Sequence, residues 1–394
     1  DSLGMAGRLA RAFLHSSLTP LVILVSLLLG LGATAILPRE EEPQITVPMA
    51  DVHVAMPGAS AAEVEQRLTY PLEKLIRELP GVEYVYSTSR PGGTLVIVRF
   101  LVGTNSEDAT VRLYSKLYAN LDRIPSGASP PLIKSHSIDD VPILALTFCS
   151  SQQGAYSLRA VAAQVDEQLK RIDDVAETRL LGGLRRQLRV EVEPEKLAAY
   201  GLQPTALARL LQAENARRWS GPVNHQNQAW MVESGAFFET LADLEALVVG
   251  SFEGRPVYLK DVARLEDGPE EPMELAFHGT PEGGLQPACT LALAKRRGAN
   301  AIRVSEAVLL RLEQLKKSLI PASVQVEVTR NYGETAAERS NELLVHMAVA
   351  VVSVSILIWV ALGRRESWVV AIAIPVTLAL TLATFVFYNF TLNR

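Results

Sequence analysis

Residues that bind metals or form disulfides are scarce in this sequence. Among 394 residues there are two cysteines, six histidines and six methionines. No two histidines lie four residues apart, so the spacing predicts no metal centre. The cysteines, Cys149 and Cys289, both lie in strand-like segments, where neighbouring thiols rarely meet disulfide geometry. We expect two separate buried thiols, and a single bridge stays open as the alternative.

Basic runs and catalytic constellations are also absent. The net charge is −5 and no Lys/Arg block occurs, which excludes nucleic acid as a partner. Asp139 and Asp140 are adjacent, but neighbouring residues on an extended chain point in opposite directions. The glycine pairs at 92–93 and 182–183 lack the context of phosphate loops and indicate turns. We therefore expect a protein that is not an enzyme.

Three long stretches carry no Asp, Glu, Lys or Arg. The first covers residues 16–38, and two more follow near the other end, at 343–363 and 367–393. Each is long enough to cross about 30 Å of hydrocarbon at about 1.5 Å per residue. The sequence predicts transmembrane helices at 16–38, 341–363 and 367–393. A cleaved signal peptide is the alternative for the first stretch, and its length disfavours that.

The flanking charges predict an orientation. Arg8 and Arg11 precede the first stretch, and Arg364 and Arg365 lie between the last two, which favours a cytoplasmic location for these loops and for residues 1–15. The acidic run 40–42 follows the first stretch on the other side. The large soluble insert is thus expected outside the cytoplasm, which means the periplasm of a double-membrane bacterium.

Residues 44–137 predict the order strand, helix, strand, strand, helix, strand. Ser60 and Glu63 form a capping box at the start of the first helix. Residues 89–93, rich in Pro and Gly, join the second and third strands as a hairpin.

The same order recurs in residues 138–181 and 273–330. Apolar residues follow the spacing 4, 4, 3, 4 from Val304 to Leu319, as they do from Val64 to Leu79. The pattern predicts two tandem ferredoxin-like split βαβ units, the second interrupted by an inserted module at 182–272. The expected fold class is membrane α-helical with a periplasmic α+β part.

The inserted module has three recognisable parts. Residues 205–213 predict a helix, and 216–231 predict a loop rich in Asn, Gln and Trp. Residues 250–268 predict a hairpin followed by a short strand.

In order and separation, several short motifs resemble a known family. They are Pro57-Gly58-Ala59 before the first soluble helix, Gly298-Ala299-Asn300 before the last one, VYLKDVARLEDG at 257–268 and TLNR at 391–394. With these motifs the chain resembles the first third of a resistance-nodulation-division (RND) efflux permease of the acriflavine-resistance, or hydrophobe/amphiphile efflux, type. The likeness covers essentially all of the sequence.

The resemblance implies a secondary active transporter, a proton antiporter of the bacterial inner membrane. Such a permease is a homotrimer that exports amphiphiles from the periplasm or outer leaflet through a tripartite complex with a periplasmic adaptor and an outer-membrane channel. It uses the proton motive force and no cofactor, and its proton relay would lie beyond Arg394. Residues 39–137 would be porter subdomain 1, 138–181 with 273–330 porter subdomain 2, and 182–272 the docking module.

The resemblance also suggests residues of a substrate path. Val141 and Leu181 match positions where the drug-exporting branch has phenylalanines, so we expect a flatter aliphatic surface with less ring stacking. Leu144 and Arg179 would lie beside it. On the neighbouring subdomain, His53 and Ser135 fall at path-lining positions.

Trp219 and Trp230 are expected to anchor the docking module by burying their rings in a neighbouring protomer. Two alternatives stay open. A heavy-metal exporter of the same family would use methionine and acidic ladders, which the sequence lacks. A membrane-tethered periplasmic scaffold would show the same spans and modules without a proton relay.

Overall fold

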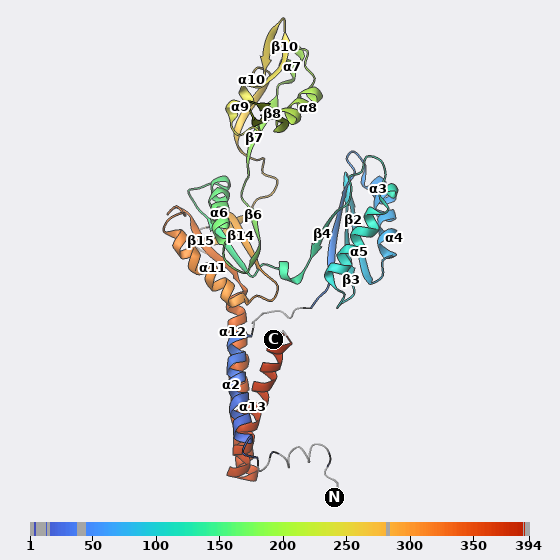
Figure 1. Cartoon of the computed structure of the whole chain (residues 1–394). Coiled ribbons are helices and arrows are strands. Elements are labelled where there is room, and N and C mark those ends of the chain that lie inside the picture. Colours follow the sequence, from blue (N-terminus) through green and yellow to red (C-terminus); the bar gives the residue numbers. More distant parts are fainter. Residues whose placement is uncertain are drawn as a thin grey trace.

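The computed structural model describes residues 16–37, 45–280 and 284–388, together with residues 4, 13 and 390. It is a mixed α/β structure with antiparallel sheets, and Figure 1 shows two sheet units beside each other above a group of long helices. Several predictions fall almost entirely outside the described residues: those for residues 1–15, the acidic run 40–42, the turn at 281–283 and the motif at 391–394.

The first unit (residues 45–136) is a sheet covered by helices on one face. Its strands pair antiparallel in the order β2-β3-β1-β4. The strands are β1 (Met49–Ala55), β2 (Val82–Arg90), β3 (Gly93–Phe100) and β4 (Leu132–His136). The helices are α3 (Ala61–Val64), a π-helical turn (Glu65–Thr69), α4 (Tyr70–Arg77) and α5 (Ser106–Tyr118).

Local sequence explains how these helices begin and bend. The predicted capping box is present: the Glu63 carboxylate accepts from the Ser60 backbone N–H at 2.9 Å, and the Ser60 hydroxyl accepts from the Glu63 N–H at 3.4 Å. The expected single helix contains a π turn just before Pro71, which has no N–H to continue the regular ladder. Its apolar stripe packs on Val52, Val96 and Val98, which are fully buried.

The second unit (residues 144–182 and 277–331) repeats this arrangement. Four strands pair antiparallel in the order β6-β14-β5-β15. When the four strands of each unit are numbered along the chain, both orders read second, third, first, fourth. A fifth strand, β13, pairs with the first residues of β14. The strands are β5 (Leu144–Cys149), β6 (Val175–Gly182), β13 (Phe277–Thr280), β14 (Gly284–Lys295) and β15 (Gln325–Asn331).

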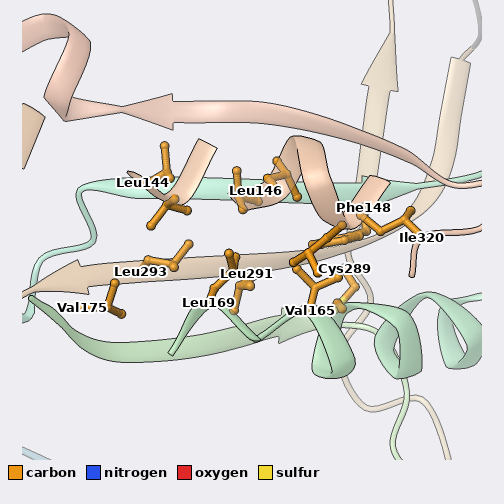
Figure 2. Close-up of a cluster of buried hydrophobic side chains, with 14 of the residues drawn as sticks. Leu144, Leu146, Phe148, Val165, Leu169, Val175, Cys289, Leu291, Leu293 and Ile320 are labelled. Carbon is orange, nitrogen blue, oxygen red and sulfur yellow. The ribbon is translucent and has the colours of Figure 1, made fainter. Parts of the chain in front are cut away.

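The core of the second unit lies between this sheet and two helices, α6 (Ala155–Leu169) and α11 (Ala301–Lys316). Figure 2 shows alternate residues of β5 and β14, among them Leu146, Phe148 and Leu291, pointing to the same side as Val165 and Leu169 of α6. Every second residue of these strands is therefore buried in the core. The residues between them lie on the opposite face of the sheet, which we call the open face.

The inserted module leaves the second unit after β6 and returns through a paired strand. Strand β7 pairs with β12 antiparallel, and Figure 1 shows the module beyond the second unit, on the side away from the long helices. Its strands are β7 (Arg186–Val192), β8 (Arg218–His225), β9 (Gln228–Ser234), β10 (Val248–Phe252), β11 (Arg255–Tyr258) and β12 (Ala263–Pro269). Its helices are α7 (Pro194–Ala199), α8 (Pro204–Glu214), α9 (Leu241–Glu245) and α10 (Leu259–Val262), packed on a small core around Leu259 and Val262.

One element of this module differs from its prediction. Residues 216–231 were expected to form a loop, but they belong mainly to a β-hairpin of β8 and β9. Its turn residues Gln226 and Asn227 both have positive φ, as a tight two-residue hairpin turn requires. The hairpin residues are almost all exposed, so no alternation of apolar and polar residues marks the strands.

Three long helices lie below the units: α2 (Thr19–Ile36), α12 (Tyr332–Leu362) and α13 (Arg364–Phe387). Within the described residues, α12 and α13 are long and apolar enough to cross a membrane, and α2 holds a shorter apolar stretch at 19–34. Helix α12 begins well before the expected residue 341, because it follows β15 without an intervening loop. Its first turn buries Gly333 and Ala336.

Candidate functional site

The open face of the second sheet holds two of the six residues that the sequence suggested for a substrate path, Arg179 and Leu181. Leu181 on β6 pairs with Thr290 on β14, and Thr290 pairs with Thr147 on β5. Directly opposite residues share a face, so these three form one row. Leu181 is 53% exposed, as a surface residue that contacts a ligand would be.

Hydroxyl groups occupy the middle of this face. The Thr147 hydroxyl lies 2.9 Å from the Thr290 hydroxyl and 2.9 Å from the Thr329 hydroxyl. The three groups satisfy one another, and none belongs to the helix-covered core. The expected aliphatic surface is thus interrupted by a polar row, which the sequence prediction missed because isolated threonines on strands carry no distinctive pattern.

Arg179 lies two residues from Leu181 on the same face of β6 and forms an ion pair with Glu177 at 2.7 Å. The Arg179 hydrogen bond lowers the pKa of the Glu177 carboxyl, and Glu177 raises the pKa of the guanidinium. Both side chains are about half exposed. The pair offers a ligand one cationic and one anionic group with no net charge.

Leu144 does not lie on this surface. Its side chain is 0% exposed and belongs to the core cluster between the sheet and α6 and α11. Its neighbour Ala145 faces the open side instead. A shift of one residue exchanges the two faces of a strand, so a position carried over from a family resemblance can fall on the opposite face.

Val141 is partly buried and precedes β5, in the segment that joins the two units. Its backbone N–H donates to the Ile138 carbonyl at 3.2 Å, which closes a short helical turn at 138–140. Val141 is therefore near the start of the second sheet, at the junction with the first unit, and not in the row of Leu181.

His53 and Ser135 fall on opposite faces of the first sheet. His53 pairs with Leu132 on the open face, whereas Ser135 pairs with Ala50, which is buried under the helices. Ser135 itself is exposed because β4 is an edge strand. The two residues cannot line one continuous surface of this sheet.

A histidine that the sequence did not single out lies near the junction of the units. The Nε2 atom of His136 lies 2.9 Å from the Asp51 carboxylate, at the end of the open face of the first sheet. His136 also contributes to the lowered pKa of Glu177 on the second sheet, and Asp140 to the raised pKa of Arg179. The connection at 137–143 thus brings His136 of the first sheet and its own Asp140 within electrostatic range of the Glu177–Arg179 pair on the second sheet.

Trp219 and Trp230 lie on opposite faces of the β8–β9 hairpin. Trp230 pairs with Val223, whereas Trp219 pairs with Glu233, which is three residues further along β9. Both rings are more than 60% exposed. They cannot form one combined anchor on a single surface, but each gives its own face of the hairpin a large apolar contact.

A cleft lies at the base of this hairpin. Its volume is about 840 Å³, and it is lined by apolar and polar side chains of β7, α8 and the segment before α9. Arg186 at its edge holds Asp267 through two hydrogen bonds of 2.8 and 2.7 Å, which fixes β7 against β12. The lining residues include Leu188, Val190, Leu211, Phe238 and Leu244.

Comparison with known proteins assigns the chain to a family. The family model described as the AcrB/AcrD/AcrF family matches residues 10–394. The chain belongs to this family. The family consists of RND efflux permeases, which are transporters and not enzymes, and the chain corresponds to the N-terminal portion of such a permease.

Individual relatives support the same assignment. The chain is 27% identical to the multidrug resistance protein MdtC of Yersinia enterocolitica over 381 residues, which is 95% of this chain and 36% of the relative. It is 28% identical over 379 residues to the proteins of that name from Yersinia pseudotuberculosis and Yersinia pestis, with the same coverage of 95% and 36%. The chain thus spans little more than a third of the length of the curated relatives that it matches.

Among the described residues, no group of three or more His, Cys, Asp and Glu side chains could hold a metal ion. The two cysteines are free and buried. Cys289 belongs to the core cluster, whereas Cys149 pairs with Ala288 on the open face, so the sheet separates the two thiols. The expectation of two separate buried thiols is confirmed.

Proposed function

We propose that this chain is the periplasmic porter and docking part, with adjoining membrane helices, of an RND-type exporter of amphiphilic compounds. The observation that carries the proposal is that the two sheet units have the same strand order. They occur in a chain of this family that also has two helices long and apolar enough to cross a membrane. This shared order supports two ferredoxin-like split βαβ units.

The proposal assigns the subdomains as follows. Residues 39–137 form porter subdomain 1, residues 138–181 and 273–330 form porter subdomain 2, and residues 182–272 form the docking module. The transmembrane helices are at 16–38, 341–363 and 367–393. Three separate hydrophobic clusters, one for each soluble part, support this division.

The same proposal places the protein in a bacterial inner membrane with a large periplasmic region. Arg364 and Arg365, at the connection between α12 and α13, favour the cytoplasmic side for that end of the helices. The sheet units, which begin at the opposite end of α12, then lie in the periplasm (Figure 1). Transport is driven by the proton motive force, without a cofactor.

The assembly that we propose is a homotrimer that works with a periplasmic adaptor and an outer-membrane channel. The β8–β9 hairpin supports this assembly because it exposes Trp219 and Trp230 on its two faces. Large exposed aromatic side chains on a hairpin are typical of contact surfaces, where they contribute most of the binding energy. A neighbouring protomer that encloses the hairpin would bury both.

Substrates would contact the open face of the second sheet. Leu181 provides an apolar contact, Arg179 and Glu177 provide charges, and Thr290 and Thr329, on either side of the buried Thr147, provide hydroxyl groups. Such a surface suits compounds that have both an apolar body and polar substituents, and Val141 lies at its end near the junction. Leu144 acts only through the core that supports β5.

The experiment is export of a fluorescent amphiphilic dye by a strain that lacks its own multidrug pumps and carries the complete gene. We expect lower dye accumulation than in the strain without the gene, and a protonophore should abolish the difference. Export that a protonophore leaves unchanged would exclude proton antiport. If the protein is present in the inner membrane and exports no amphiphile, the scaffold alternative is favoured.

A further inference from the structure

Strand β14 extends past the end of its neighbour β5. Residues 288–293 of β14 pair with β5, whereas residues 284–287 pair only with β13. The two strands form an extension of the sheet, which we call the strap (residues 277–280 and 284–287). Phe277 and Leu285 of the strap are well exposed, so apolar burial holds it only weakly.

The strap bends over the open face of the second sheet. The Nε2 atom of His278 lies 2.6 Å from the carboxylate of Glu327 on β15. In the sheet order β13-β14-β5-β15 two strands lie between the strands of these residues. In a flat sheet the two backbones would be about 14 Å apart, farther than a histidine and a glutamate side chain reach together. The contact between His278 and Glu327 therefore requires the strap to curve across β5.

Burial on the open face agrees with this curvature. Glu327 pairs with Thr147, and Cys149 follows two residues later on the same face. Thr147 is 4% exposed and Cys149 is 1% exposed, although α6 and α11 pack on the other face of the sheet. On the far strand β6, Leu181 and Arg179 are exposed. The face is thus divided into a covered part near Cys149 and an open part near Leu181.

We propose that His278 and Glu327 form a latch that holds the strap over the covered part of this face, and that the latch limits the size of the compound that the face accepts. The size limit rests on the proposed export function, whereas the latch itself does not. The His278 side chain is 16% exposed and that of Glu327 is 58% exposed, so solvent reaches the pair and local opening needs no global unfolding.

Opening of the strap should expose the thiol of Cys149, which is otherwise inaccessible. The first test is therefore maleimide labelling of Cys149. It is done in membranes that carry the full-length protein as its gene encodes it. The variants His278→Ala and Glu327→Gln should label at Cys149 about tenfold faster than the native protein, as expected when a local opening becomes easier. His278→Ala decides the test, because burial and the Glu327 carboxylate raise the pKa of the Cys149 thiol, so that removing this carboxylate speeds labelling even without opening. Glu313→Gln is the matched control, because it removes an ion-pair carboxylate from the outer side of α11.

Cys289 is the internal reference within the same molecule. Its side chain is 0% exposed and lies in the core, and burial raises the pKa of its thiol to about 11. Peptide mapping should show no change at Cys289 in either variant. Equal labelling of Cys149 in native and variant proteins would overturn the latch. Faster labelling of both cysteines would also overturn it, because the strap would then not open as a separate element.

The second test concerns compound size. Cells with Glu327→Gln should gain resistance to large amphiphiles relative to small ones of the same type, by about threefold or more if local opening limits access. If Cys149 labels faster but the resistance to large and small amphiphiles is unchanged, the size limit is overturned and the latch is supported. Absence of export by the native protein, with the labelling result as expected, would contradict the proposed function and not the latch.

Discussion

Gly333, in the first turn of α12, lies directly against Ser305 of α11. A Cβ atom on Gly333 would be 2.6 Å from the Ser305 hydroxyl and 2.9 Å from the Ala301 carbonyl oxygen. Ser305 is itself buried, and its hydroxyl has no hydrogen-bond partner. The long helix therefore meets the second unit through small residues in close contact, at the point where β15 ends.

We expect Gly333→Ala to destabilise this contact. The new methyl group would overlap backbone as well as side chain, so overpacking should cost about 1–3 kcal/mol. Thermal unfolding in detergent, followed by circular dichroism, measures the effect. Ser305→Ala is the companion variant: removing an unpartnered hydroxyl should leave the unfolding temperature unchanged or raise it. A lower unfolding temperature for Ser305→Ala would show that the hydroxyl has a partner.

Acid should weaken the root of the inserted module through Asp267. Arg186 lowers the pKa of the Asp267 carboxyl below its ordinary value of 3.8, so the ion pair stabilises the folded state above that value and loses its effect as pH falls through the folded-state pKa. Asp267→Asn should therefore unfold at a lower temperature than the native protein at pH 7. The two curves of unfolding temperature against pH should converge below pH 3.8. A difference that persists in acid would assign the effect to something other than this charge.

No disulfide should form between Cys149 and Cys289. The thiols lie on opposite faces of one sheet, and two Cys side chains that point apart cannot bond without backbone movement. Mass spectrometry of protein purified without reductant should recover both peptides unlinked. A linked peptide would contradict the placement of Cys149 on the open face.

Leu181→Phe should favour compounds with aromatic rings. Leu181 is exposed beside Thr290, so a larger ring fits without entering the core, and ring stacking contributes about 1 kcal/mol. We expect a few-fold rise in resistance to aromatic amphiphiles relative to aliphatic ones. Leu310→Phe, at an exposed position of α11, is the control that adds a ring elsewhere on the unit. An unchanged resistance profile would remove Leu181 from the substrate surface.

The two tryptophans of the β8–β9 hairpin should act independently. Because Trp219 and Trp230 lie on opposite faces, each Ala variant should remove a different part of a protomer contact, and their effects should add. Native mass spectrometry at several protein concentrations measures the trimer fraction, which we expect to fall for each single variant and further for the double variant. Loss for one tryptophan alone would show that only one face of the hairpin is covered.

Periodicity in the sequence was sufficient for the elements that have one buried side. The helix from Ala155 to Leu169 and the strand at 93–100 follow their apolar patterns closely, because burial imposes the 3.6 and 2.0 periods. The same reasoning failed for the β8–β9 hairpin, where both faces are exposed and no period exists. Pairing between strands, and not burial, stabilises that element.

The candidate site was harder to predict than the fold. Leu181 and Arg179 lie on the open face, whereas Leu144 is in the core because its place on β5 depends on which alternate residues face the helices. The contact between His278 and Glu327 joins residues 49 positions apart on strands that are not neighbours. Such a contact depends on the bending of the whole sheet, which no local pattern encodes.

The direct continuation of β15 into α12 makes the second unit and this long apolar helix one lever. Asn331 is the last strand residue and Tyr332 the first helical one, so no flexible segment separates them. A helix of 31 residues is about 46 Å long, and a tilt of about 5° would displace one end by about 4 Å relative to the other. The first unit has no such rigid arm among the described residues. Movement of α12 would therefore change the angle between the two open faces and not carry both units along together.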